Sequence, residues 1–187
     1  STEDHLRDTL IAGDGLCNVE AVRECVSKGK EAIDWLSDIG TSFTRDKSSN
    51  NYHLTQEGGH SKRRVVHSED ATGKEVSSSL AEIVRSISNI KVLENHICVD
   101  LVTAKGRCVG AYVLDINTNE VKTFSSGSTI IATGGASKIY LYTSNPDGSS
   151  GDGIGLAWRA GCKVENLEFN QFHPTCLYHP EAKSFLL

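Results

Sequence analysis

The sequence predicts a mixed α/β fold, in which helices accompany an antiparallel β-meander and one buried strand. Three observations support this fold class: an amphipathic helix pattern over residues 72–87, three strand patterns between residues 92 and 124, and a β-branched apolar segment, Ser128–Thr133, that leads into two glycines. An apolar strand of this last kind usually lies in a sheet that is covered on both faces. Such a sheet needs more parallel strands than this sequence contains, so we expect only part of it here.

Two helices are predicted in the first forty residues. Leucine and isoleucine at helical spacing predict a short helix that ends at Gly13, and Asn18 is the predicted N-cap of a second helix that ends at Gly40. Polar residues 42–51 predict a loop. Residues 52–66 predict short strands on either side of a two-glycine turn.

The remaining elements follow from patterning in the same way. Thr72 and Glu75 form a T-x-x-E capping box at the start of the amphipathic helix. The strand patterns cover residues 92–102, 108–115 and 121–124, with a turn at 117–119. Asp152–Ala160 predicts another helix, closed by Gly161, and residues 164–187 are expected to be strand and loop.

Composition narrows the possible functions. The 187 residues carry a formal net charge of −5 and the only dense basic run is Lys62–Arg64, so a general nucleic-acid-binding role is not expected. No segment approaches the roughly 18–20 apolar residues of a membrane-spanning helix, and the polar start Ser1–Asp8 is unlike a signal peptide. The 6 cysteines form no C-x-x-C pair, which predicts neither disulfides nor a zinc site and favours the cytoplasm. Methionine is absent even at position 1, so we expect a piece of a longer protein or a processed form.

Two glycine-containing segments are candidate cofactor sites. In Ile131–Gly135 the final glycines would let the backbone approach a planar or phosphorylated ligand closely, although an ordinary strand-to-loop turn has the same pattern. In Ser149–Gly155 glycines precede a helix and free backbone N–H groups for an anion, and Asp152 either caps the helix or accepts a hydrogen bond from a sugar hydroxyl. The dinucleotide fingerprint G-x-G-x-x-G is absent, because Leu156 stands where the third glycine would be.

Two further segments carry side chains that suit a substrate. The carboxylate of Glu57 and the imidazole of His60 lie on either side of the predicted two-glycine turn, and the alternative is a hairpin tip with solvated polar residues. In Glu168–Thr175, an extended chain would place Gln171 and His173 on one face. An amide beside an imidazole suits carboxylate binding or proton handling, and the alternative is a core histidine bonded to the backbone.

Metal and nucleophile chemistry are not expected. His53, His60 and His67 are spaced by seven residues, without the short local spacing or cysteine and aspartate partners of a metal site. Neither G-x-S-x-G nor a P-loop is present.

Taken in order, these segments resemble one known family. The chain resembles the succinate dehydrogenase/fumarate reductase flavoprotein family over essentially its whole length. The resemblance rests on collinear motifs, which together are far more specific than any one: Glu57–Ser61, Asp70–Gly73, Ala132–Ala136, Ser150–Gly153 and Asn170–Thr175.

The resemblance implies FAD as the cofactor and a role for each candidate residue. The implied cofactor contacts are Ala132, Thr133, Gly134, Gly135 and Asp152, together with His60 and Ser61 beside the isoalloxazine. The implied substrate contacts are Glu57, Gln171 and His173, of which Glu57 and His173 are the implied catalytic residues.

One residue distinguishes two branches of this family. Members that act on succinate or fumarate carry Phe where this chain has Glu57. A carboxylate can pair with the α-ammonium of an amino acid, whereas succinate would leave it unpaired. The resemblance therefore implies oxidation of L-aspartate to iminoaspartate. FAD would accept the hydride, and oxygen or fumarate would reoxidise the flavin. The product would enter a pathway toward quinolinate and NAD, which implies a functional link to quinolinate synthase. A fumarate reductase or succinate dehydrogenase type of subunit and an inert folded fragment are the alternatives.

The resemblance also implies a domain division. Residues 1–166 are expected to be the central part of a Rossmann-like FAD-binding domain without its N-terminal G-x-G-x-x-G strand, and residues 167–187 the beginning of a capping domain. The family's catalytic arginine would lie beyond Leu187. We therefore expect the isolated piece to bind FAD poorly, to be inactive, and to self-associate through an uncovered sheet edge.

Overall fold

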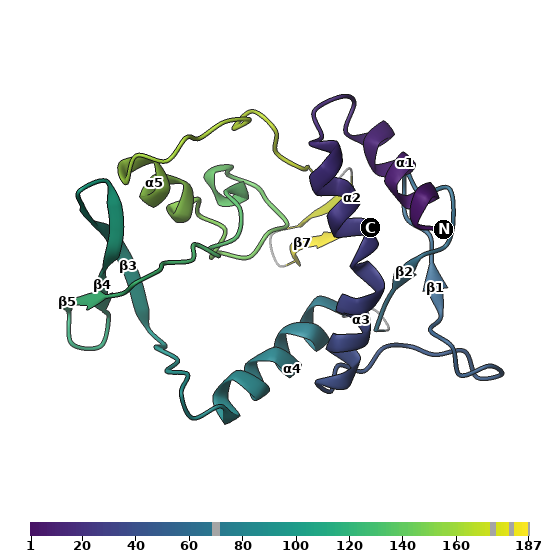
Figure 1. Ribbon diagram of the computed structural model, residues 1–187, viewed down its shortest axis with the longest axis horizontal. Coiled ribbons are helices and arrows are strands. Elements are labelled where there is room, and N and C mark those ends of the chain that lie inside the picture. Colours follow the sequence, from purple (N-terminus) through teal and green to yellow (C-terminus); the bar gives the residue numbers. More distant parts are fainter. Residues whose placement is uncertain (69–71, 173–174, 180–181, 187) are drawn as a thin grey trace. The chain divides into compact units, whose positions relative to one another are not determined.

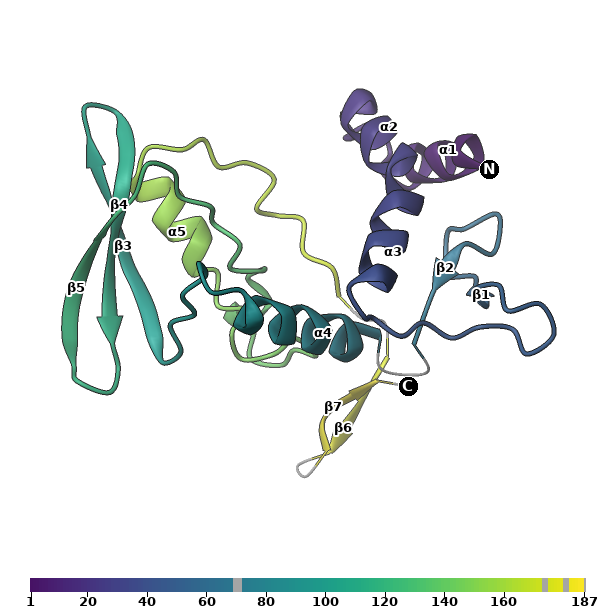
Figure 2. The same ribbon diagram turned by 60° about the horizontal axis from the view of Figure 1, so that its bottom comes forward.

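A computed structural model describes residues 1–68, 72–172, 175–179 and 182–186. The chain divides into two compact units, Ser1–Val92 and Leu93–Leu187. Figures 1 and 2 draw their elements, and each unit is described by itself below. No helix among the described residues is both long and apolar enough to cross a membrane.

The first unit begins with three helices: α1 (Thr2–Ala12), α2 (Val19–Ser27) and α3 (Gly29–Asp38). The predicted N-cap is confirmed, because the Asn18 side chain accepts a hydrogen bond from the backbone N–H of Ala21 at 3.0 Å. The prediction of one helix from there to Gly40 is wrong. Lys28 ends α2 and caps α3, and Gly29 follows it, where the absence of a side chain weakens a continuous helix.

Two very short strands flank the glycine turn, as predicted. β1 (Leu54–Thr55) pairs antiparallel with β2 (Val65–Val66), with Leu54 opposite Val66. The polar segment before β1 is irregular apart from a single bridge between Arg45 and Tyr52, where the Arg45 guanidinium lies 4.4 Å from the centre of the Tyr52 ring.

The amphipathic helix α4 spans Thr72–Ser86, as its pattern predicts. Thr72 is the first described residue of α4 and the residues directly before it lie outside the described part of the chain, so the capping box stays a prediction. The Glu75 carboxylate accepts a hydrogen bond from the backbone N–H of Ser42 at 3.0 Å. This bond ties α4 to the loop that follows α3. The buried apolar side chains described in this unit are Leu6 and Phe43.

The second unit contains the predicted meander. Strands β3 (His96–Ala104), β4 (Arg107–Asp115) and β5 (Glu120–Ser125) form an antiparallel sheet in the order β3-β4-β5, visible as the long twisted ribbon in Figure 2. Gly110 of β4 lies so close to β5 that a Cβ there would overlap the carbonyl oxygen of Phe124. Only glycine therefore allows these two strands to approach at this point.

The predicted strand at residues 128–133 is not formed, which corrects the sequence prediction. Among the described residues, no strand pairs with this segment, and the Ile130 side chain is 90% exposed. A β-branched sequence favours extended backbone, but a strand exists only where a neighbour supplies the ladder hydrogen bonds.

Helix α5 (Asp152–Arg159) confirms the predicted helix, with Gly161 following it in the left-handed region. It packs against β3, where the Arg159 Nε lies 3.2 Å from both carboxylate oxygens of Asp100. A short 3₁₀ turn, η1 (Ser137–Ile139), precedes α5. The chain ends in a hairpin of β6 (Cys176–His179) and β7 (Ala182–Leu186), in agreement with the predicted strand and loop.

Candidate cofactor and substrate site

The two-glycine turn of the first unit brings Glu57 and His60 together. The backbone N–H of His60 donates to the carbonyl of Glu57 at 3.1 Å, and Gly59 has a φ of +79°. A four-residue turn with a left-handed third residue is a type II geometry, which glycine adopts without strain. Glu57 and His60 therefore stand at the two ends of one turn, Glu57 exposed and His60 half-buried.

Both arms of the turn are tied to each other. The Gln56 side chain donates to the carbonyl of His60 at 2.5 Å, and the backbone N–H of Arg64 donates to the carbonyl of Thr55 at 3.0 Å. These bonds hold the arms but leave the tip open to the described part of the chain, because a Cβ built on Gly58 or Gly59 would meet none of its atoms within 4 Å. A ligand can thus approach the backbone of the tip.

Asp8 of α1 contacts the second arm of this turn, which sequence reasoning missed. Its carboxylate accepts hydrogen bonds from the backbone N–H and the Oγ of Ser61, both at 2.8 Å, and from the guanidinium of Arg64. These donors, with the Ser61 N–H first, hold the pKa of Asp8 well below its usual range. No sequence pattern connects position 8 with position 61, since 53 residues separate them.

His60 has a polar atom without a partner among the described residues. Its Nδ1 is buried and makes no hydrogen bond, and its ring lies 6.4 Å from that of His5. Burial lowers the pKa of His5, and the nearby Arg64 charge adds to the effect. An orphaned buried nitrogen is costly unless a ligand satisfies it, which fits the implied place of His60 beside a cofactor.

The structure brings the two glycine-containing segments of the second unit together. The backbone N–H of Gly151 donates to the carbonyl of Gly135 at 3.2 Å, which joins the segments directly. A Cβ on Gly153 would overlap the Thr133 hydroxyl, so the start of α5 lies directly against the predicted cofactor segment. Gly134 has a φ of +74° with open space around it, and Gly135 is equally open. This exposed backbone fits the close approach of a dinucleotide cofactor.

Asp152 is the first residue of α5 and is exposed, and Gly151 is the N-cap, in the left-handed conformation. The predicted role of Asp152 as a side-chain cap is therefore not observed. The carboxylate is exposed at the start of the helix, where a hydroxyl donor could reach it.

The segment that carries Gln171 lies against η1. The Ser137 hydroxyl donates to the side-chain oxygen of Asn170 at 3.1 Å, and the rings of Tyr140 and Phe172 meet edge to face at 5.0 Å. Gln171 is exposed on this segment. His173 lies outside the described residues, so its pairing with Gln171 stays a prediction.

In the second unit, Thr133, Gly134 and Gly135 lie against the start of α5, where Asp152 stands; Gln171 belongs to the same unit, while Glu57, His60 and Ser61 belong to the first unit. Ala132 is exposed beside Thr133. Within the described residues no group of three potential ligands could hold a metal ion. His53 and His67 do meet, with Nδ1 and Nε2 2.7 Å apart, but His60 is not part of that contact.

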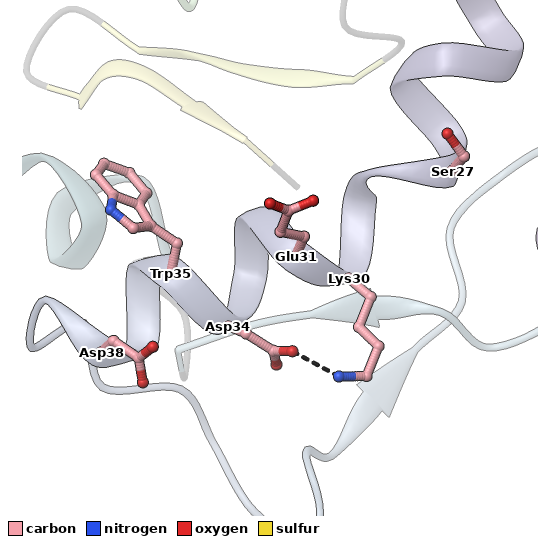
Figure 3. Close-up of a pocket in the computed structure, with 6 residues that line it drawn as sticks. All are labelled: Ser27, Lys30, Glu31, Asp34, Trp35 and Asp38. Atoms are coloured by element: carbon pink, nitrogen blue, oxygen red, sulfur yellow. Dashed lines mark hydrogen bonds and ion pairs between the residues drawn. The ribbon is translucent and has the colours of Figure 1, made fainter.

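A hollow of about 460 Å³ lies elsewhere in the first unit (Figure 3). Its lining projects from α2 and α3 and includes the Lys30–Asp34 ion pair at 2.5 Å: Ser27, Lys30, Glu31, Asp34, Trp35 and Asp38. None of the predicted site residues contributes to it, so it does not bear on the candidate site.

Comparison with known proteins gives the chain its relatives. The family model described as FAD binding domain matches residues 1–187. Similar curated proteins include L-aspartate oxidases of Pseudomonas aeruginosa, 54% identical over 199 residues, and of Vibrio cholerae, 53% identical over 197 residues. Each of these comparisons covers 100% of this chain and 37% of the relative, so the chain spans little more than a third of their length.

Solved structures agree with this likeness. Mycobacterium smegmatis Sdh1 in complex with UQ1 has a TM-score of 0.94 at 28% identity, over 100% of this chain and 33% of the other. A variant of the E. coli quinol fumarate reductase subunit FrdA has a TM-score of 0.94 at 26% identity, over 100% of this chain and 32% of the other. The predicted fold class, family resemblance and FAD cofactor are confirmed by these likenesses.

Proposed function

Since this chain belongs to the FAD-binding-domain family of flavoproteins, we propose that it is part of an L-aspartate oxidase, which oxidises L-aspartate to iminoaspartate. The observation that carries the proposal is Glu57, a carboxylate at one end of an open glycine turn. Curated relatives at 53–54% identity bear the name of this enzyme.

Glu57 would pair with the α-ammonium of aspartate and orient it, a charge-assisted contact that succinate cannot make. Gln171, with His173, would hold a substrate carboxylate. FAD, when bound, supplies the two-electron oxidising chemistry, and the chain's part is to position the substrate Cα–H. Thr133, Gly134 and their neighbours offer open backbone for that cofactor.

The wider assignment follows from the same proposal. Oxygen or fumarate would reoxidise the flavin, and the product would lead toward quinolinate and NAD, with quinolinate synthase as the functional partner. Residues 1–166 would belong to the FAD-binding domain and residues 167–187 to the start of a capping domain.

A second candidate is a dicarboxylate-oxidising or fumarate-reducing flavoprotein. The similar solved structures favour it, since they include a succinate dehydrogenase-type protein and a quinol fumarate reductase subunit. Glu57 argues against it. Succinate and fumarate have no ammonium group, so the Glu57 carboxylate would lie beside their central carbons without a positive partner.

Turnover of the longer protein that contains this chain decides between the candidates. We expect L-aspartate and not succinate to reduce the flavin, which is followed spectroscopically in the absence of oxygen, and KM is measured from turnover with oxygen or fumarate as the acceptor. Glu57→Gln keeps the size of the side chain and removes its charge, so KM for aspartate should rise by about tenfold or more.

Glu82→Gln is the matched control, because Glu82 is an exposed carboxylate on α4 away from the turn. It should leave KM unchanged. Succinate oxidation by the unmodified protein, or equal KM values for the two variants, would overturn the assignment to aspartate.

A further inference from the structure

The glycine turn that carries Glu57 and His60 is held at its arms, by the hydrogen bonds from Gln56 to His60 and from Arg64 to Thr55, rather than at its tip. Its closing bond joins His60 to Glu57, and a Cβ built on either tip glycine would meet no described atom within 4 Å. Two glycines in sequence leave a large conformational entropy in such a turn. A site that must orient a substrate therefore needs an external contact to keep the turn in one position.

Asp8 supplies such a contact at the next residue. Its carboxylate receives two hydrogen bonds from Ser61, which directly follows His60, and a third from Arg64 on the same arm. Asp8 is 9% exposed, and a buried carboxylate is stable only where donors replace its water. Here all the described donors belong to the turn's second arm, so the hydrogen bonds of one side chain couple α1 to that arm, in addition to the contact between the His5 and His60 rings.

The coupling is specific to Asp8 among the carboxylates of α1. Asp4, one turn earlier, pairs with Arg7 of the same helix at 2.9 Å and with the N-terminal end of the chain, and among the described residues it makes no hydrogen bond or ion pair with the turn. A contact within one helix has no effect on a distant loop. Asp4 therefore provides an internal control.

We propose that Asp8 is a positioning residue, which sets the Glu57–His60 turn for substrate through its bonds to Ser61 and Arg64. The proposal rests on the function proposed above. Asp8 itself touches neither substrate nor cofactor in this assignment, and it acts only by fixing the backbone that carries Glu57 and His60.

The first test is hydrogen exchange in the longer protein, which needs no activity. Asp8→Asn retains one acceptor oxygen but loses the charge that binds Arg64, so amides in residues 57–64 should exchange about tenfold faster or more. Asp4→Asn should leave that segment unchanged. Equal exchange of residues 57–64 in the two variants overturns the proposal.

The second test is kinetic. Asp8→Asn should raise KM for aspartate by about tenfold, because misplacement of the turn weakens orientation, while the flavin content per chain stays equal to that of Asp4→Asn. Ser61→Ala removes one of the two Ser61 donors and should have a smaller effect. The variant that combines Asp8→Asn with Ser61→Ala should have about the same KM as Asp8→Asn alone, because both substitutions act through the same hydrogen bonds.

If Asp8→Asn does not fold, Ser61→Ala and Arg64→Lys weaken the same contact more mildly and the same exchange measurement applies. If the unmodified protein oxidises succinate rather than aspartate, the proposed function fails, and KM is then compared for succinate. Unchanged exchange in residues 57–64 across all these variants refutes the positioning role under either substrate.

Discussion

At the scale of single residues, the packing of the two glycine-containing cofactor segments depends on one close contact, at Gly153. Gly153 of α5 has Ile131 and Thr133 directly beside it, with the Ile131 Cγ2 2.8 Å from where a Cβ would be. In a helix an alanine is ordinarily more favourable than a glycine by about 1 kcal/mol. Here the added methyl group would push residues 131–135 away from α5.

We therefore expect Gly153→Ala to destabilise the longer protein by about 1–3 kcal/mol and to reduce its flavin content. Thermal unfolding and the flavin absorbance after desalting measure the two effects. Gly127→Ala is the control, because that position has open space and lies in the same unit. A Gly153→Ala variant that is more stable than the control would contradict the packing described here.

Individual residues also show the limit of sequence reasoning at the site. The glycine motifs and Glu57 were found because their residue types are chemically suggestive in a short window. Asp8 was not, because an aspartate within a helix is unremarkable until its partner at position 61 is known. The Nδ1 of His60, which has no partner among the residues described, could not be predicted either, because burial leaves no pattern in the neighbouring sequence.

At the scale of elements, the meander contains a buried carboxylate that makes the stability of the protein depend on pH. Asp115 at the end of β4 is 7% exposed, and its carboxylate lies 2.7 Å from Lys122 Nζ of β5 and 3.6 Å from His96 Nε2 of β3. The hydrogen bond from Lys122 lowers the pKa of Asp115 below its ordinary value. The same bond raises the pKa of Lys122.

A depressed carboxyl pKa in the folded state stabilises the protein above the unfolded-state value of about 3.9, and this contribution is lost as the pH falls through the lower folded value. The melting temperature should therefore decline below about pH 4. Asp115→Asn should reduce that acid-induced decline, whereas Asp147→Asn, whose side chain is exposed, should not. Identical slopes of Tm against pH for all three proteins would refute the role of this pair.

The helices and strands also show which parts of the fold depend on nearby residues and which depend on distant ones. Helices α1, α4 and α5 and the three meander strands lie where periodicity predicts them, except that β3 begins at His96 rather than near Val92. The break at Lys28 was missed because the apolar stripe continues through it. The strand predicted at 128–133 failed because pairing depends on a neighbouring strand and not on the segment's own residues.

At the scale of the whole molecule, the described residues leave much apolar surface exposed. Ile130, Leu141 and Trp158 are 90%, 86% and 69% exposed, whereas the only buried apolar side chains described are Leu6, Phe43 and Leu156. A folded protein usually exposes apolar side chains singly rather than in such numbers. The chain also spans little more than a third of its curated relatives.

We therefore expect the isolated 187-residue chain to bind an apolar dye, to self-associate and to retain little FAD. Light scattering, dye fluorescence and the absorbance of the desalted chain after incubation with FAD measure these properties. The longer protein is the control and should not bind the dye. A monomeric isolated chain that binds no dye and keeps stoichiometric flavin would show that these residues form a complete site.

The amino-acid order alone was sufficient to predict most helices, the meander and the glycine motifs with Glu57, because each depends on residues a few positions apart. The three-dimensional arrangement was needed for the Gly135–Gly151 contact, the open backbone of Gly134 and the bonds of Asp8 to Ser61 and Arg64. Those contacts join residues far apart in the chain, and a hydrogen bond between distant residues leaves no periodic pattern in either segment.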